Sequence, residues 1–186
     1  MMRALICDSM CAALLAAAVS AQALEPALPA TGSVQYGFAP QDRVDRMIID
    51  AIDGARRQVL VQAFSFTHRG IARALIDAHR RGVEVAVIAD REQTGTIRNS
   101  VVPDLARAGV PVSLDGEHAA AHNKIIVIDA GAADCAVITG SFNFTFAAQY
   151  DNAENAVVLR GNPPLCDAYR DNWQRHRAHA VPYGGR

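Results

Sequence analysis

Short apolar, β-branched runs alternate along the chain with stretches in which apolar residues recur every three or four positions. The runs at 34–38, 59–66 and 83–89 predict strands, and the stretches at 40–57 and 71–78 predict amphipathic helices between them. A weaker helix is expected at 97–108, followed by a short strand at 110–114. This alternation predicts βαβ units and a sheet covered by helices on both faces.

The second half of the chain has shorter elements. Strands are expected at 124–129, 136–139 and 155–159, separated by polar loops, and Pro163 begins a last helix that runs to about residue 179. There is no internal repeat or low-complexity segment. The predicted fold class is α/β, a single α/β/α sandwich around a mixed β-sheet, with 24–33 as an N-terminal linker and 34–180 as the domain.

Residues 1–23 have the pattern of a secretory signal peptide. Arg3 gives a positive start, residues 11–19 form an apolar run, and residues 21–23 fit the small-x-small pattern of a cleavage site. A membrane anchor needs about 20 apolar residues, and Asp8 and Ser9 interrupt this stretch. We therefore expect an exported protein, periplasmic or secreted, with no integral membrane segment after signal cleavage.

Signal cleavage would leave Cys135 and Cys166 as the remaining cysteines. If the strands at 136–139 and 155–159 pair antiparallel, the start of one lies beside the end of the other, which brings the two sulfurs within reach. An oxidising compartment favours a disulfide between them, and two buried thiols are the alternative.

The formal net charge of −1 lacks the basic excess of many nucleic-acid binders, so charge does not select a substrate. The basic residues themselves are more informative, because Lys124 is the single lysine among 18 Lys and Arg. In an extended chain, residues two apart point to the same side, so His122 and Lys124 project together. The apolar residues at 125–128 predict a central, buried strand, and a lysine at its edge needs an anion such as phosphate to offset desolvation.

Asp129 is an odd number of residues away from His122 and Lys124, so on a regular strand its carboxylate is expected to point to the opposite face of the sheet. Its predicted role is structural, holding a loop or pairing with an arginine. A zinc site built from His122 and Asp129 is disfavoured by this parity and by the positive charge of Lys124. No cofactor and no metal ligand are expected in this sequence.

Two further polar segments offer candidate site residues. Ser141 and Asn143 are two apart and present a hydroxyl and an amide from one side, although a polar turn after a strand explains them equally well. Glu154 lies at the mouth of an apolar strand, where a carboxylate needs a donor such as a histidine N–H. An exposed glutamate at a strand edge is the alternative for Glu154.

Together these residues resemble the HxKxxxxD signature of the phospholipase D superfamily, followed by its GSxN element and a downstream acidic residue. The resemblance is closest to the small bacterial endonucleases of the Nuc type, through GSFNFT, ENAVV, GFAP, AFSFT and RRGVEV, and it extends from about residue 34 to 173. The segment from 129 to 140 is somewhat longer than in those relatives, which affects the loop beside the site.

The resemblance implies two-step phosphoryl transfer through a phosphohistidine, in which one histidine is the nucleophile and another protonates the leaving oxygen. The implied catalytic residues are His122, Lys124, Ser141, Asn143 and Glu154, with Asp129 as part of the signature; Lys124, Ser141 and Asn143 would bind the substrate phosphate. A second HxK motif would need a second lysine, so two protomers must each contribute His122, and a homodimer with a shared active site is expected.

The other histidines, at 68, 79, 118, 176 and 179, are expected to be surface or helix residues, although His118 is close enough in sequence to contact substrate. Three functions stay open at this stage. The favoured one is a nonspecific endonuclease acting on DNA or RNA. A phospholipase D acting on phosphatidylcholine-type lipids shares the same chemistry, and a catalytically silent nucleic-acid-binding module is the least favoured.

Overall fold

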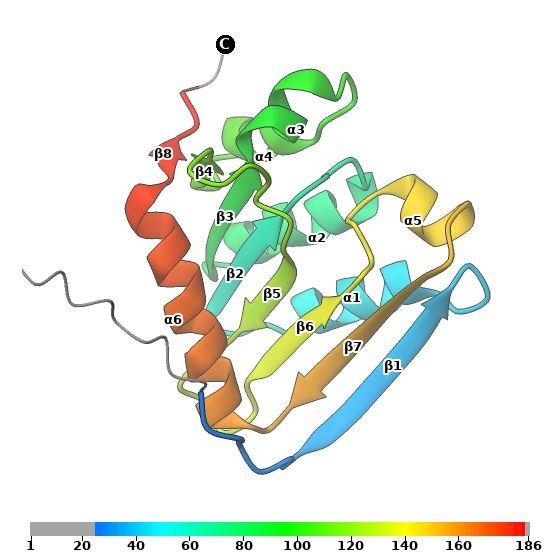
Figure 1. Ribbon diagram of the computed structural model, residues 1–186, viewed down its shortest axis with the longest axis vertical. Helices are drawn as coiled ribbons and strands as arrows, with labels where there is room; N and C mark the ends of the chain where they lie inside the picture. The colour runs from blue at the N-terminus through cyan, green and yellow to red at the C-terminus, as the bar shows by residue number, and fades with distance from the viewer. Residues whose placement is uncertain (1–24, 185–186) are drawn as a thin grey trace, which may run out of the picture.

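The computed structural model describes residues 25–184 and contains one mixed eight-stranded sheet with helices packed on both faces (Figure 1). The strands lie in the order β1-β7-β6-β5-β2-β3-β4-β8. Their bounds are β1 Ser33–Ala39, β2 Gln58–Ala63, β3 Glu84–Asp90, β4 Val112–Asp115, β5 Lys124–Ile128, β6 Ala136–Gly140, β7 Glu154–Arg160 and β8 Val181–Pro182. The helices are α1 Val44–Asp53, α2 Arg69–Arg80, α3 Arg91–Thr96, α4 Val102–Arg107, α5 Phe146–Tyr150 and α6 Pro163–His179.

The sheet combines two kinds of strand pairing. β2, β3 and β4 are parallel neighbours, as the βαβ alternation of the first half predicts. The second half adds antiparallel strands, because β5 pairs with β2 and β6, and β7 pairs with β6 and β1. β5 thus lies in the middle of the sheet, and all five of its residues are buried. The predicted mixed sheet in an α/β/α sandwich is confirmed.

Side-chain alternation divides the core between the two faces of the sheet. Alternate residues of the central strands, including Val61, Ile126 and Ile138, pack with the apolar faces of α1, α2 and α4 in the larger core. The intervening residues, including Leu60 and Val127, pack under α6 with Trp173. Because α6 covers β2, β4, β5 and β6, no helix among residues 25–184 lies over the same face of β7 and β1 (Figure 1).

Two links hold α6 on its face of the sheet. The indole N–H of Trp173 donates to the carbonyl of Val61 at 3.0 Å in a buried position. At the other end of the helix, Cys166 in the first turns forms a disulfide with Cys135, which precedes β6. The antiparallel pairing of β6 with β7, from which this bridge was predicted, is present in the register Ala136↔Arg160. The disulfide prediction is therefore confirmed.

Three short elements differ from the sequence prediction. The helix expected at 97–108 is confined to α4, and an additional short helix, α3, begins directly after β3, where the Asp90 side chain accepts from the N–H of Gln93. The short helix α5 begins in the same way at Thr145, whose hydroxyl accepts from the N–H of Ala148. The two-residue β8 extends the sheet beyond β4. Within residues 25–184, no helix has the length and apolar character to cross a membrane.

Candidate active site

The candidate site lies where three neighbouring antiparallel strands begin or end, at one end of the sheet. Lys124 opens β5, Gly140 closes β6 and Glu154 opens β7. The registers Ile125↔Thr139 and Gly140↔Ala156 place these three strand ends side by side. Polar residues that follow or precede these positions therefore lie at the same end of the sheet.

His122 and Lys124 are brought into direct contact. The Lys124 Nζ lies 2.9 Å from Nδ1 of His122 and 3.3 Å from its Nε2, and it donates to the His122 carbonyl at 2.7 Å. A lysine ammonium can only donate hydrogen bonds, so the His122 ring nitrogen that pairs with it is the acceptor. The imidazole itself is exposed, whereas the lysine is buried with 8% of its surface accessible.

Phe64 forms a platform beneath both groups. Its ring centroid lies 4.2 Å from that of His122, and the Lys124 Nζ lies 4.8 Å from the Phe64 centroid. The backbone N–H of Phe64 also donates to the carbonyl of Asn123, which fixes the residue between the two site side chains. No pattern in the sequence predicts this role for Phe64. Its position one residue after β2, the strand that pairs with β5, is what brings it to the site.

Burial sets the electrostatic character of Lys124. Loss of hydration lowers the pKa of its ammonium below the ordinary lysine value, and the negative charge of Glu154 partly offsets that effect. A phosphodiester carries a negative charge of the kind that would stabilise this buried cation. The site therefore favours an anionic ligand.

Gly140 allows β6 to approach β7 closely beside the site. A Cβ at this position would lie 2.3 Å from the carbonyl oxygen of Asn155, so no other residue fits without moving β7. The chain then turns into the segment that carries Ser141 and Asn143. The Ser141 Oγ accepts from the backbone N–H and side-chain amide of Asn155, at 3.1 and 3.3 Å, which leaves its hydroxyl proton free to donate.

Asn143 has a buried polar atom without a partner. Its Oδ1 makes no hydrogen bond within the described chain. Oδ1 is an acceptor, so only a donor could pair with it, whereas the Nδ2 protons of the same amide can donate to an anion.

Glu154 has a different neighbour from the one predicted. Its Oε1 accepts from the side-chain amide of Asn152 at 3.2 Å, and its charge acts on Lys124. Within the described chain it makes no hydrogen bond to His122. The expected carboxylate–histidine pair is therefore not formed, because the His122 ring is turned toward Lys124 and Phe64 instead.

Asp129 lies at the opposite end of β5 from the site. Its carboxylate accepts from the backbone N–H groups of Arg56, Arg57 and Gln58 at 2.7 to 2.9 Å. It thereby fixes the loop between α1 and β2. Asp129 therefore lies away from His122 and Lys124, and it holds a loop, as expected from its position in the strand.

Four of the other histidines also have defined positions. His68 is not a surface residue: its side chain is 11% exposed, and its Nδ1 accepts from the N–H of Ile71 at the start of α2. His118 is exposed and His176 and His179 lie on α6, as expected, but all three also converge on the buried carboxylate of Asp115. Sequence reasoning missed this cluster, since its members come from the β4–β5 loop and from α6.

A family model described as "Cardiolipin synthase, PLD-like domain" matches residues 48–177, which include every candidate residue of the site. The chain belongs to the phospholipase D superfamily. Among curated members, it is 40% identical over 141 residues to "Phospholipase D" of Rickettsia bellii, covering 76% of this chain and 67% of the relative. It is 30% identical over 152 residues to "Mitochondrial cardiolipin hydrolase" of Xenopus laevis, covering 82% and 70%.

A solved structure of the phospholipase D superfamily has a closely similar fold. The phospholipase D family member Nuc from Salmonella typhimurium superposes with a TM-score of 0.76 at 35% identity, over 81% of this chain and 97% of Nuc. The predicted likeness to the Nuc type is confirmed. The chain is thus a hydrolase of the phospholipase D superfamily.

Proposed function

We propose that this protein is a metal-independent phosphodiesterase that cleaves nucleic acid through a phosphohistidine intermediate. The observation that carries the proposal is the contact between an exposed imidazole, His122, and a buried ammonium, Lys124, at 2.9 Å. In this proposal the exposed imidazole would attack a phosphorus atom, and the ammonium would lie beside the phosphate oxygens.

In the first step, a ring nitrogen of His122 attacks phosphorus as the bond to the leaving oxygen breaks, and a second histidine gives that oxygen a proton. In the second step, water attacks the phosphohistidine, the P–N bond breaks, and the water proton passes to the second histidine. Lys124 stabilises the negative charge in both transition states. The free proton of Ser141 and an Nδ2 proton of the Asn143 amide would donate to the remaining phosphate oxygens.

The second histidine is proposed to be His122 of another copy of the chain. Among the described residues, no other histidine contacts Lys124, and the sequence contains no second lysine for another such pair. The exposure of the His122 ring is consistent with a site that a second protomer completes.

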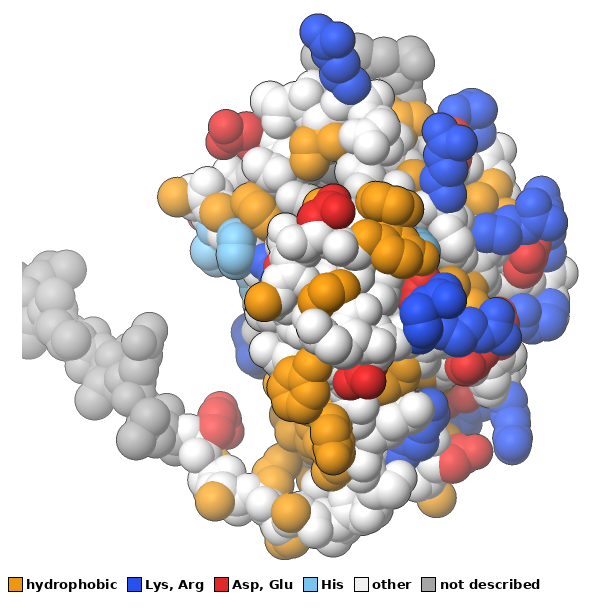
Figure 2. Space-filling model, turned by 90° about the vertical axis from the view of Figure 1, so that its right-hand side faces the viewer, with side chains coloured by type: hydrophobic (Ala, Val, Ile, Leu, Met, Phe, Trp, Pro, Cys, Tyr) orange, Lys and Arg blue, Asp and Glu red, His pale blue; other side chains and the backbone are white. Residues whose placement is uncertain are grey.

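An apolar surface next to the site supports association of two copies. Val34, Tyr36 and Phe38 on β1 are 55% to 66% exposed, on the part of the sheet face that α6 leaves uncovered. Phe38 pairs in register with Asn155, next to Glu154, so this strip reaches the edge that carries the site. Figure 2 shows hydrophobic side chains gathered at the surface on the side of the molecule that carries α5, where Phe146 and Tyr150 stack at 4.3 Å.

Nucleic acid is proposed as the substrate because the chain covers 97% of the length of Nuc at 35% identity and carries sequence runs that resemble those of the Nuc-type endonucleases. A phospholipid remains the second candidate, favoured by the printed names of the curated relatives, "Phospholipase D" and "Mitochondrial cardiolipin hydrolase". Both substrates present the same phosphodiester to His122.

The test incubates untagged protein with plasmid DNA, RNA, and phosphatidylcholine or cardiolipin vesicles in excess chelator, while circular dichroism verifies that the fold persists. We expect cleavage of DNA or RNA, none of lipid, and loss of activity in His122→Ala but not in the control variant His79→Ala. Lipid cleavage without nuclease activity would favour the second candidate. Binding of DNA without cleavage would indicate a silent module.

We also propose that the protein is exported. The predicted signal peptide lies outside the described residues, but the Cys135–Cys166 disulfide favours an oxidising compartment. Mass spectrometry of the protein purified from periplasm or medium should find a chain that begins at Leu24.

A further inference from the structure

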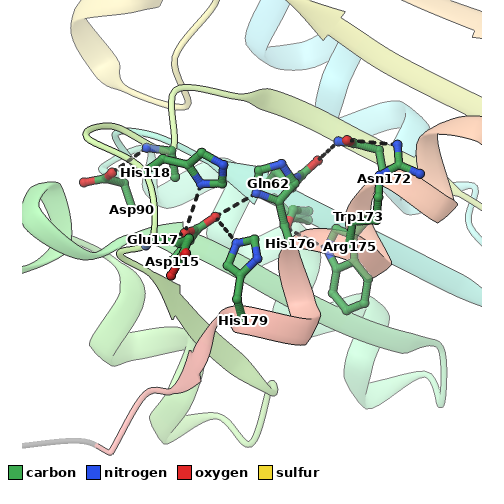
Figure 3. A network of polar contacts seen from close by, with 12 residues as sticks. Gln62, Asp90, Asp115, Glu117, His118, Asn172, Trp173, Arg175, His176 and His179 are labelled. Carbon is green, nitrogen blue, oxygen red and sulfur yellow. Dashed lines mark hydrogen bonds and ion pairs between the residues drawn. The ribbon is translucent and has the colours of Figure 1, made fainter. Parts of the chain in front are cut away.

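A second cluster of ionisable side chains lies outside the phosphodiester site. One ligand-type atom from each of Asp115, His118, His176 and His179 lies within 4.8 Å of the others. Figure 3 shows the three imidazoles arranged around the carboxylate, with His176 and His179 projecting from the end of α6. Within residues 25–184, no other group of three or more His, Cys, Asp or Glu side chains has this compactness.

The cluster is centred on a fully buried carboxylate. The Asp115 side chain is 0% exposed, and its Oδ2 lies 2.7 Å from Nδ1 of His176 and 3.2 Å from Nε2 of His179. Its Oδ1 lies 3.5 Å from Nδ1 of His118 and accepts from the backbone N–H of Glu117 at 3.1 Å. The backbone contact orients the carboxylate independently of the histidines, as an outer partner does for a metal ligand.

Three imidazoles facing one carboxylate are more than hydrogen bonding requires. The ring centroids of the three histidines are 5.0 to 5.4 Å apart, and one ring nitrogen of each lies within 4.8 Å of the others and of the carboxylate. A cation among these atoms would bind the imidazoles through nitrogen lone pairs and the carboxylate through its charge.

We propose that Asp115, His118, His176 and His179 form a binding site for a divalent transition metal ion, with Zn²⁺ the best fit. Three imidazoles and one carboxylate make a tetrahedral set of nitrogen and oxygen ligands, which suits zinc and not magnesium or calcium. Tetrahedral bonds of about 2.0 to 2.1 Å place ligand atoms about 3.3 Å apart. The four ligand atoms now lie within 4.8 Å of one another, so they would move closer as the ion binds. A proton on a ring nitrogen that turns to the ion would shift to the other ring nitrogen or leave.

All four ligand positions are supplied by the protein, which is the pattern of a structural site and not of a catalytic one. The ion would join two parts of the chain that are far apart in sequence. Asp115 and His118 belong to the end of β4 and the β4–β5 loop, whereas the other two ligands are on α6. That loop leads directly into His122, and the Asp90 carboxylate already holds it through the N–H of Ala121.

The site is tested by titrating chelator-treated, untagged protein with Co²⁺ and then with Zn²⁺. We expect one Co²⁺ per chain with the intense visible absorption of tetrahedral coordination, its displacement by Zn²⁺, and a rise of several degrees in melting temperature. His176→Ala and His118→Ala should each weaken binding at least about tenfold. His79→Ala, which changes a histidine on α2 outside the cluster, should bind like the wild type.

His118 is 48% exposed, so its substitution tests binding without disturbing the core. The proposal would be overturned if the wild-type protein bound Co²⁺ or Zn²⁺ no more tightly than the His118→Ala and His176→Ala variants. Octahedral Co²⁺ absorption would also contradict the four-ligand site. These readouts are independent of hydrolysis, so their failure leaves the proposed phosphodiesterase activity untouched.

Discussion

The Nζ of Lys124 lies 2.9 Å from Nδ1 of His122 while the same ammonium donates to the His122 carbonyl. One buried cation thus positions the imidazole and remains available to a phosphate. Since burial lowers the pKa of Lys124, keeping the charged form in the fold costs stability.

Replacing Lys124 with Met should therefore separate activity from stability. Hydrolysis should fall by about 10²- to 10³-fold, because a donor to the transition-state charge is lost. The melting temperature should stay equal or rise, because an uncharged side chain of similar length removes the desolvation cost. Lys124→Arg should also lose most activity, because its planar guanidinium does not reproduce a point charge. A marked drop in the melting temperature of Lys124→Met would contradict this account.

A shared site predicts that inactive chains suppress active ones. Mixing wild type with an equal amount of His122→Ala under subunit exchange should reduce activity per wild-type chain to about half, since random pairing places half of the wild-type chains in heterodimers. The wild-type pH profile should be bell-shaped, since the two copies must differ in protonation. Full activity per wild-type chain in the mixture would refute the two-protomer mechanism.

The disulfide should contribute substantially to stability. It closes a loop with a sequence separation of 31 residues. Chain-entropy arguments assign about 3.5 kcal/mol to a loop of that size. Denatured, unreduced protein should label no thiol of Cys135 or Cys166, and reduction should lower the unfolding free energy measured in urea. Labelling of two thiols per chain before reduction would exclude the bridge in solution.

Two carboxylates of the signature region should respond differently to substitution. Asp129→Asn removes an acceptor for the backbone N–H groups of the α1–β2 loop, so the unfolding free energy should fall by about 1 to 2 kcal/mol. Its hydrolysis rate at a temperature where it is folded should change little. Glu154→Gln should lower the hydrolysis rate and leave the unfolding free energy nearly unchanged, because Glu154 acts on the charge of Lys124. A large rate loss in folded Asp129→Asn would reassign that residue to the chemistry.

His68 should make stability depend on pH. Burial lowers its pKa below the ordinary histidine value, although the nearby Asp45 carboxylate opposes this, and its Nδ1 must stay unprotonated to accept from Ile71. The unfolded chain therefore binds a proton more readily near pH 6.5, so stability falls as pH drops through that value. His68→Asn keeps an N-cap acceptor without titrating, so it should lose less stability than wild type between pH 7.5 and 5.5 in urea denaturation.

The sequence by itself determined the order of the main strands and helices, the mixed sandwich and the shared direction of His122 and Lys124. These follow from local rules, since strand periodicity of two and helix periodicity of 3.6 depend on residues close in the chain. The Cys135–Cys166 bridge needed one further assumption, the antiparallel pairing of two consecutive strands.

Only the tertiary structure decided which groups meet across long separations. Phe64 reaches His122 because β2 pairs with β5, and Glu154 contacts Asn152 and not His122 because the imidazole packs on Phe64. Asp115 meets His176 across 61 residues because α6 returns over the sheet to β4. No periodicity in the sequence predicts these long-range contacts, because they depend on the position of each strand in the sheet and on where the last helix packs.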